Sequence, residues 1–363
     1  MHWWHLYMLT LAGAGAISAG ATWIARLIGY RLEIVDQPES EAHKQHRHAT
    51  PVLGGTAMFT AWILVLVGGF LIFPALRPTL GSEVVDYIPN LKSSLPRIYV
   101  IAGGAAAMLL MGMLDDKRPL GAFQKLFVQG AITLAVAFYG VRITIFIAHP
   151  YITCLITAAW IVVIVNGINF FDNTDGLAGG TAVVAAFIFM LGAGMREQYF
   201  VAVLAASTCG IALGFLIFNW PPATIFMGDA GSHLLGYLLA VTGALATYYQ
   251  PGGGMTRLSV LIPLLVLAVP IYDFFAVIVI RRLAGRPIYQ GDHSHISHRF
   301  IAMGLSKGST IVLVHLLNFI IGASALTLFW LPLGGALIVI LQAVAVLALV
   351  TILHAARISH ANG

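Results

Sequence analysis

Residues 152–168 read ITCLITAAWIVVIVNGI, and residues 169–177, which follow without a break, read NFFDNTDGL. The first stretch contains no Asp, Glu, Lys or Arg. Its length is close to the ~20 apolar residues that a helix needs to cross the ~30 Å hydrocarbon core of a bilayer. The second stretch carries two carboxylates directly at the end of the apolar run. The pair therefore predicts a membrane-spanning helix with a polar end, a pattern that recurs along the chain.

The composition of the whole chain indicates a membrane protein. Of 363 residues, 59% are apolar and 9% are Asp, Glu, Lys or Arg, whereas an ordinary soluble domain has roughly 25% charged residues. So few charges cannot cover the surface of a soluble globule. A soluble enzyme, a nucleic-acid-binding module and a disordered protein are therefore excluded. The net charge of +5 is interpreted as basic loops on one side of the membrane, and we expect no nucleic acid partner.

Apolar runs long enough to span a bilayer recur along the chain. They cover residues 3–28, 52–74, 97–114, 126–147, 152–168, 177–194, 199–218, 231–249, 258–280, 309–331 and 334–356. We predict an all-α fold, a single integral-membrane domain over residues 1–363 built as a polytopic transmembrane helix bundle of about eleven spans (10–11). The first run lacks a basic leader and a cleavage site, which favours a retained span. Cys154 and Cys209 lie inside apolar runs and are interpreted as packing residues.

Positive charge sets the expected orientation, with the N-terminus out and the C-terminus in. The inner side then receives residues 29–51, 115–125, 169–176, 219–230, 281–308 and the C-terminal tail. With the inner ends of the spans it carries 13 of the 19 basic and 11 of the 14 acidic residues. The positive-inside rule does not explain the gathering of acids. We therefore expect the active site at the cytoplasmic face of the plasma (inner) membrane.

Two of the inner loops carry carboxylates at the end of a span. Asp115 and Asp116 are adjacent, so they repel each other unless a cation lies nearby, and such a pair can hold Mg²⁺ or supply a base. The alternative is a solvated pair that neutralises Lys117 and Arg118. After the span 152–168, a second set of polar side chains recurs every third residue and shares one side of a helix or turn. This set consists of Asn166, Asn169, Asp172 and Asp175. Helix capping explains one of the four but not the set.

The loop 218–233 reads FNWPPATIFMGDAGSH. Its glycines let the backbone approach a ligand closely, and a helix that begins near Ser232 would attract phosphate. Asp229 could bridge that phosphate through Mg²⁺, although an ordinary helix N-cap would read the same way.

Two histidine-containing loops complete the inner face. Residues 290–300 read QGDHSHISHRF, and their histidines are interpreted as donors to phosphate or sugar. Zinc ligands and a plain surface cluster are the alternatives. Residues 43–55 begin with a basic stretch, His43 to His48, that suits an anion, and a membrane anchor would look similar. Together the loops predict Mg²⁺-dependent phosphoryl chemistry at the inner membrane surface, between a soluble phosphate ester and a lipid-borne substrate.

These segments, in this order, resemble glycosyltransferase family 4, the polyprenyl-phosphate N-acetylhexosamine-1-phosphate transferases. The nearest type is the undecaprenyl-phosphate GlcNAc-1-phosphate transferase, and phospho-MurNAc-pentapeptide translocase is a relative. The resemblance runs from about residue 31 to residue 308. It rests on Asp-Asp after the third span, on Asn-x-x-Asn-x-x-Asp-Asn-x-Asp-Gly-Leu, on Phe-Met-Gly-Asp-x-Gly-Ser and on His-x-x-His-Arg.

The resemblance implies that a UDP-N-acetylhexosamine gives its sugar-1-phosphate to polyprenyl (undecaprenyl) phosphate. UMP leaves, and a lipid-linked glycan such as O-antigen of lipopolysaccharide or another cell-wall polymer is begun. By position it implies that Asp115 and Asp116 are catalytic, with Asp115, or alternatively Asp116, as the base or the orienting group. It implies that Asn169 and Asp229 hold Mg²⁺, with Mn²⁺ as the alternative ion. The implied substrate-binding residues are Lys44, Lys125, Asp172, Asp175, Asn219, His295, His298 and Arg299. Asp273 also fits a family position, without an implied role.

The last loop departs from the translocase pattern, because His295 and His298 are spaced rather than consecutive. That spacing favours UDP-GlcNAc and argues against UDP-MurNAc-pentapeptide, although other UDP-N-acetylhexosamines stay open. A secondary transporter would need acids near mid-membrane, and Asp273 is the only acid that falls inside one of the apolar runs. A non-catalytic lipid-carrier scaffold would not need the metal-binding acids. A monomer and a homodimer are both compatible with the sequence.

Overall fold

The computed structural model describes residues 2–37, 49–87, 93–143, 147, 149–246, 257–287 and 294–361, with the side chains of 73, 74 and 354–361 excepted. Lys44 lies outside the described residues. The chain divides into two compact units, Met1–Ala246 and Thr247–Gly363, and each is described by itself.

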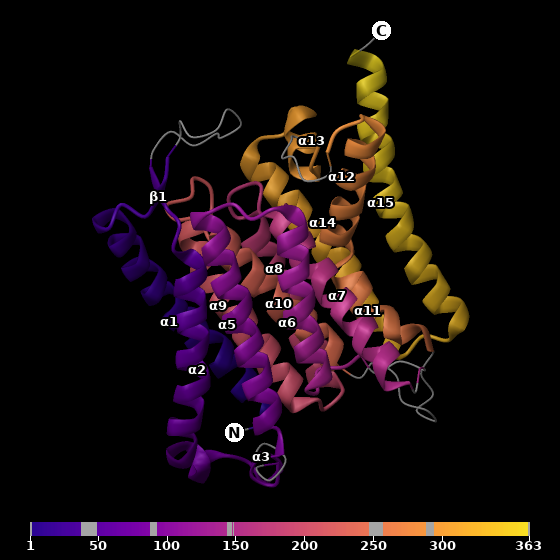
Figure 1. Cartoon of the computed structure of the whole chain (residues 1–363). Helices are drawn as coiled ribbons and strands as arrows, with labels where there is room; N and C mark the ends of the chain where they lie inside the picture. The colour runs from indigo at the N-terminus through magenta and orange to yellow at the C-terminus, as the bar shows by residue number, and fades with distance from the viewer. Residues whose placement is uncertain are drawn as a thin grey trace. The chain divides into compact units, whose positions relative to one another are not determined.

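The first unit is a helix bundle (Figure 1). Its helices are α1 (Trp3–Arg31), α2 (Gly54–Leu76), α3 (Ser82–Val85), α5 (Leu95–Lys117), α6 (Ala122–Phe138), α7 (Pro150–Phe171), α8 (Leu177–Met195), α9 (Tyr199–Asn219) and α10 (Gly228–Leu245), with the 3-10 turn η2 (Arg77–Thr79). Two short strands, β1 (Val35–Asp36) and β2 (Thr50–Pro51), pair antiparallel, Val35 opposite Pro51 and Asp36 opposite Thr50.

The second unit is also helical. It contains η3 (Arg257–Leu261), α11 (Ile262–Val266), α12 (Ala268–Leu283), α13 (Ile296–Ala302), α14 (Lys307–Leu326), η4 (Thr327–Phe329) and α15 (Leu333–Ala361). α14 packs against α11, α12, α13 and α15 and is the centre of the unit.

The predicted all-α membrane bundle is confirmed. Each of the eleven apolar runs contains a helix in the structure. Eight helices of the described part are long and apolar enough to cross a membrane, and the pair Arg257–Val266 and Ala268–Leu283, bent by 69°, makes up to nine. α6 is apolar but shorter, because its last turn ends at Phe138 rather than near 147. The count of eleven spans and the orientation stay predictions. Cys154 and Cys209 are both buried and free of a disulfide, as expected.

Helix α10 occupies the interior of the first unit, where it packs against α2, α5, α7, α8 and α9 (Figure 1). Every residue from Ala230 to Ala244 is buried. Two side-chain hydrogen bonds connect α10 to its neighbours. The Tyr237 hydroxyl donates to the Ile101 carbonyl of α5 at 3.2 Å. The Trp160 indole of α7 donates to the Ala240 carbonyl at 2.9 Å. The middle of α10 is therefore held by both α5 and α7.

The close contact between α5 and α10 requires a glycine at position 112. A Cβ built on Gly112 would lie 2.5 Å from the Cα of Ala230, well inside van der Waals contact. Only a residue without a side chain lets the two backbones approach this closely.

We expect Gly112→Ala to lower the free energy of unfolding by about 1–3 kcal/mol, because the added methyl group forces α5 and α10 apart. Thermal unfolding of the detergent-solubilised protein measures the effect. Gly103→Ala is the matched control on the same helix, since its Cβ would meet nothing within 4 Å. Equal melting temperatures for the two variants would contradict the packing argument.

Candidate active site

Four helix ends of the first unit meet around Asp229, in the first turn of α10. The C-terminal turns of α5 and α7 bring Asp115, Asp116 and Asn169 to this place. The first turn of α6 brings Lys125. All five of these predicted site residues are thus joined by direct contacts, although they come from segments up to 114 residues apart.

The Lys125 ammonium bridges two carboxylates. It donates to Oδ2 of Asp229 at 2.9 Å and forms an ion pair with Oδ2 of Asp115. The Asp115 side chain is only 2% exposed, and its Oδ1 accepts from the Leu120 amide at 2.7 Å. The alternative of a solvated Asp115 that neutralises Lys117 or Arg118 is therefore wrong. The Asp229 side chain keeps 30% exposure and can still reach a ligand.

Asn169 fixes the other side of Asp229. Its Nδ2 donates to Oδ1 of Asp229 at 2.8 Å and to the Ser232 hydroxyl at 2.9 Å. Asp229 therefore accepts on both oxygens, from Lys125 and from Asn169. It does not cap its own helix, so the helix-cap interpretation of the Gly-Asp motif is wrong for Asp229.

The residue that caps α10 is Asp116 of α5. Its Oδ1 accepts from the Asp229 amide at 2.8 Å, and its Oδ2 accepts from the Ala230 amide at 3.2 Å. A carboxylate at a helix N-terminus satisfies free amides and also interacts favourably with the helix dipole. The expectation that this helix begins near Ser232 and offers its amides to phosphate is wrong, because α10 begins at Gly228 and Asp116 occupies those amides.

Gly228 makes this capping possible. Its φ is +66°, in the left-handed region where a side chain is strained. A Cβ at this position would also lie 2.6 Å from Oδ2 of Asp116. Two features therefore require a glycine before Asp229: the left-handed turn that starts α10, and the close approach of the Asp116 carboxylate.

Two of the predicted substrate-binding residues, Asn219 and Asp175, contact the loop 220–227. Oδ1 of Asn219 accepts from the Gly176 amide at 2.9 Å, and its Nδ2 donates to the Ile225 carbonyl at 2.9 Å. Oδ2 of Asp175 accepts from the Ala223 amide at 3.1 Å. Both side chains thus shape this loop, and through it the approach to α10.

Asp172 follows the last turn of α7 and is half-buried. Burial raises its pKa well above the ordinary value, and the carboxylates of Asp229, Asp175 and Asp116 raise it further. This part of the site therefore carries an excess of negative charge that a cation would relieve.

The remaining predicted residues lie in the second unit. His295 and Arg299 are buried, at 5% and 4% exposure, whereas His298 is half-buried. Both buried side chains contact Asp273.

In the first unit, Asn166 does not join the carboxylate cluster directly: its Nδ2 donates to Gln129 of α6 at 2.6 Å.

Two contacts of the site were not predicted. Ser232 accepts from Asn169, and the His233 ring nitrogen Nδ1 contacts the Asp229 carbonyl. The signal for both was the helical spacing, because residues 232 and 233 lie one turn after Asp229.

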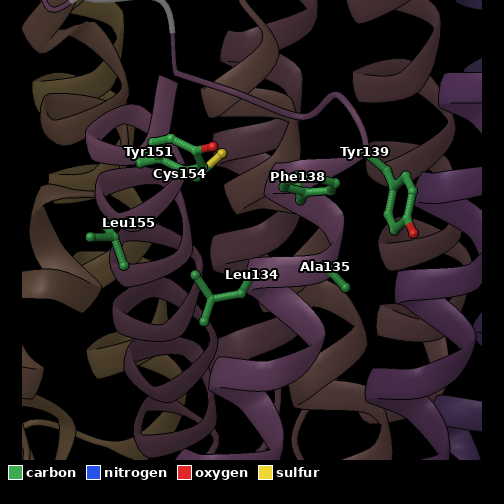
Figure 2. A pocket seen from close by; sticks show the side chains of 7 residues that line it. All are labelled: Leu134, Ala135, Phe138, Tyr139, Tyr151, Cys154 and Leu155. Atoms are coloured by element: carbon green, nitrogen blue, oxygen red, sulfur yellow. The ribbon is translucent and has the colours of Figure 1, made fainter. Parts of the chain in front are cut away.

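An apolar hollow of about 500 Å³ lies at the other ends of α6 and α7 (Figure 2). It is lined by Leu134, Ala135, Phe138, Tyr139, Tyr151, Cys154 and Leu155. Fifteen residues of α7 separate Cys154 from Asn169, which is roughly 22 Å along a helix. Among the described residues, no carboxylate or basic side chain lines the hollow, and it is not the candidate active site.

A helical membrane bundle with an Asp–Lys–Asp–Asn cluster at one end defines a class of protein: a multi-pass membrane enzyme that handles charged groups beside the lipid. Comparison with known proteins agrees. The sequence model of Glycosyl transferase family 4 matches residues 98–247, which run from the first turn of α5 to the end of α10 and include the whole cluster.

Full-length relatives make the assignment definite. A Bacillus subtilis protein, named as a probable undecaprenyl-phosphate N-acetylglucosaminyl 1-phosphate transferase, is 32% identical over 85% of this chain and 82% of its own length. The decaprenyl-phosphate N-acetylglucosaminephosphotransferase of Mycobacterium leprae is 31% identical over 89% and 85%. The phospho-N-acetylmuramoyl-pentapeptide-transferase of Clostridioides difficile is 36% identical over 44% and 58%. The chain belongs to glycosyl transferase family 4.

We expect Asp116→Asn to destabilise the start of α10 by about 0.5–2 kcal/mol, the usual value of a helix cap. The amide group would keep one acceptor oxygen but turn an NH₂ group toward a backbone N–H. Thermal unfolding in detergent measures the change. Lys117→Gln, at the neighbouring exposed position, is the control and should melt with the wild type. An Asp116→Asn variant that melts with the control would refute the capping role.

Proposed function

We propose that this protein transfers N-acetylglucosamine-1-phosphate from UDP-GlcNAc to polyprenyl phosphate and releases UMP. The observation that carries the proposal is the contact of Lys125 with both Asp115 and Asp229 at one end of a membrane bundle. The names of the Bacillus subtilis and Mycobacterium leprae relatives support the same transferred group and the same kind of lipid acceptor. The enzyme class, sugar-1-phosphate transfer to polyprenyl phosphate, follows from the family.

The reaction exchanges one phosphoanhydride bond for another. A terminal oxygen of the lipid phosphate attacks the phosphorus atom that carries the sugar. The bond from that phosphorus to the bridging oxygen breaks, and the electron pair leaves with UMP. Asp115 lies at the Lys125 ammonium, where it can orient the attacking oxygen or accept its proton. Lys125 would attract the lipid phosphate and offset the charge that grows during transfer. Direct attack and a phospho-enzyme route are both compatible with these groups.

The donor set of the site fits Mg²⁺. Asp229, with Asn169 beside it, supplies oxygen ligands of the kind that Mg²⁺ prefers. Within the described residues no group of three or more His, Cys, Asp or Glu side chains gathers in metal-binding geometry. Mg²⁺ ordinarily binds through one or two carboxylates and completes its shell with water and substrate phosphates, so this donor set suffices. When bound, the ion would neutralise the diphosphate of the donor.

The location of the site supports a cytoplasmic reaction. Asp115, Asp116, Asn169 and Asp229 all belong to the side of the chain that carries the basic excess, which by the positive-inside rule faces the cytoplasm of the plasma (inner) membrane. UDP-sugars are soluble, and a polyprenyl phosphate presents its phosphate at the membrane surface. The product would begin a lipid-linked cell-surface glycan, such as a cell-wall polymer or the O-antigen of lipopolysaccharide.

We expect Asp229→Asn to reduce UMP release at least about 100-fold, because it removes charge that faces Lys125 and the proposed Mg²⁺. The assay combines purified protein, UDP-GlcNAc, undecaprenyl phosphate and Mg²⁺. Calorimetry should show Mg²⁺ binding in the presence of UDP for the wild type and its loss in the variant. The control is Asp86→Asn, an exposed acid far along the chain from the site motifs. Undiminished turnover by Asp229→Asn would refute the metal assignment.

We expect UDP-GlcNAc to be used with a kcat/KM at least about tenfold above that of UDP-MurNAc-pentapeptide. The reasons are the spaced histidines of the last loop and the full-length match to GlcNAc-1-phosphate transferases. UMP release is compared across UDP-GlcNAc, UDP-GalNAc, UDP-QuiNAc and UDP-MurNAc-pentapeptide, with a lipid-free reaction as the blank. Preference for the pentapeptide donor would reverse the assignment of the sugar.

A further inference from the structure

Asp273 of α12 is fully buried, at 0% exposure, and the proposed reaction gives it no role. Buried carboxylates in membrane helices are costly and usually have a partner. The partners of Asp273 come from the segment that begins helix α13, in the same unit. This contact has a consequence for how the His-x-x-His-Arg motif works.

Three donors converge on the Asp273 carboxylate. Nδ1 of His295 donates to Oδ2 at 2.8 Å, and the Ile296 amide donates to Oδ1 at 2.7 Å. Nη2 of Arg299 also donates to Oδ1, at 3.3 Å. Ile296 is the first residue of α13, so Asp273 caps this helix from outside while it pairs with the guanidinium.

Neighbouring groups hold the guanidinium of Arg299 in place. It lies over the ring of Tyr272, with 5.6 Å from its central carbon to the ring centroid. Its Nη1 lies 3.4 Å from the Tyr272 hydroxyl. At 4% exposure Arg299 is enclosed with its counter-charge. An enclosed and paired guanidinium has little freedom left to bind a phosphate.

His298 differs from the residues on either side of it. Ser297 and Arg299 are buried, whereas the side chain of His298 is half-buried. Its ring centroid lies 6.4 Å from that of His295. The orientation of His298 thus depends on how α13 is docked, and the docking depends on Asp273.

We propose that Asp273 is a positioning residue. His295 and Arg299 anchor α13 to it rather than bind the substrate. Together the three residues fix α13 so that His298 is available to the substrate. The assignment of His298 to the substrate rests on the proposed function. The anchoring itself rests on the three contacts with Asp273. Removing one partner of a buried ion pair is far more disruptive than replacing both partners with neutral groups, which makes the proposal testable.

The experiment compares Asp273→Asn, Arg299→Met and the double variant, with Arg282→Met as control at an exposed position of α12. Asp273→Asn keeps the shape but leaves the buried guanidinium without counter-charge. We expect it to lower the melting temperature in detergent by at least about 5 °C. The same variant should lower kcat/KM for UDP-GlcNAc about tenfold or more. The double variant should recover most of both, and Arg282→Met should match the wild type.

A further variant, His298→Ala, separates anchoring from binding. It should raise the KM for UDP-GlcNAc and leave the melting temperature unchanged. The proposal is overturned if the double variant regains stability but keeps a raised KM and Arg299→Met alone also has a raised KM, because Arg299 would then contact the substrate. Unchanged melting of Asp273→Asn would overturn it as well. If the wild type turns over no UDP-sugar, the proposed function fails, and the melting temperatures still decide the anchoring.

Discussion

Helix α10 is buried along almost its whole length, and the free backbone amides of its first turn therefore need acceptors from elsewhere in the protein. Asp116 of α5 supplies two carboxylate oxygens to the amides of Asp229 and Ala230. Ala230 is buried, and an unpaired amide there would be costly, so the position of α5 and the start of α10 are coupled. The side chain of Asp229 points where it does because its own backbone is held in this way.

The same coupling concentrates charge. Once Asp116 has fixed Asp229 beside the end of α5, the Asp115 carboxylate is close enough for Lys125 to bridge the two. One ammonium does not balance the five carboxylates Asp115, Asp116, Asp172, Asp175 and Asp229. Burial raises the pKa of Asp172, and its neighbours Asp229, Asp175 and Asp116 raise it further. The proposed diphosphate substrate would therefore need a cation at this site, because the charge around the partly exposed Asp229 is already negative.

Sequence patterns predicted the helical bundle and most of the candidate site. Apolar length marked every long helix, and acids at run ends marked the residues that converge on Asp229. What the patterns missed depends on tertiary contact: 113 residues separate Asp116 from the amide it caps, and 22 separate Asp273 from His295. The predicted start of α10 was four residues too late, because the periodicity of apolar residues does not reveal the left-handed turn at Gly228. Family resemblance named residues but not their partners.

Asp116 and Asp273 use the same device in separate units. Each carboxylate belongs to one helix and accepts from the first amides of another. Asp116 of α5 accepts from α10 in the first unit, and Asp273 of α12 accepts from α13 in the second. An acid in an apolar bundle is usually taken as a sign of chemistry. Here the free amides at a helix start also require an acceptor, and a carboxylate that accepts from them orients the neighbouring side chains through their backbone. The acids of this protein therefore differ in their partners: Asp116 and Asp273 accept from the first amides of another helix, whereas Asp229 accepts from the side chains of Lys125 and Asn169 and stays partly exposed.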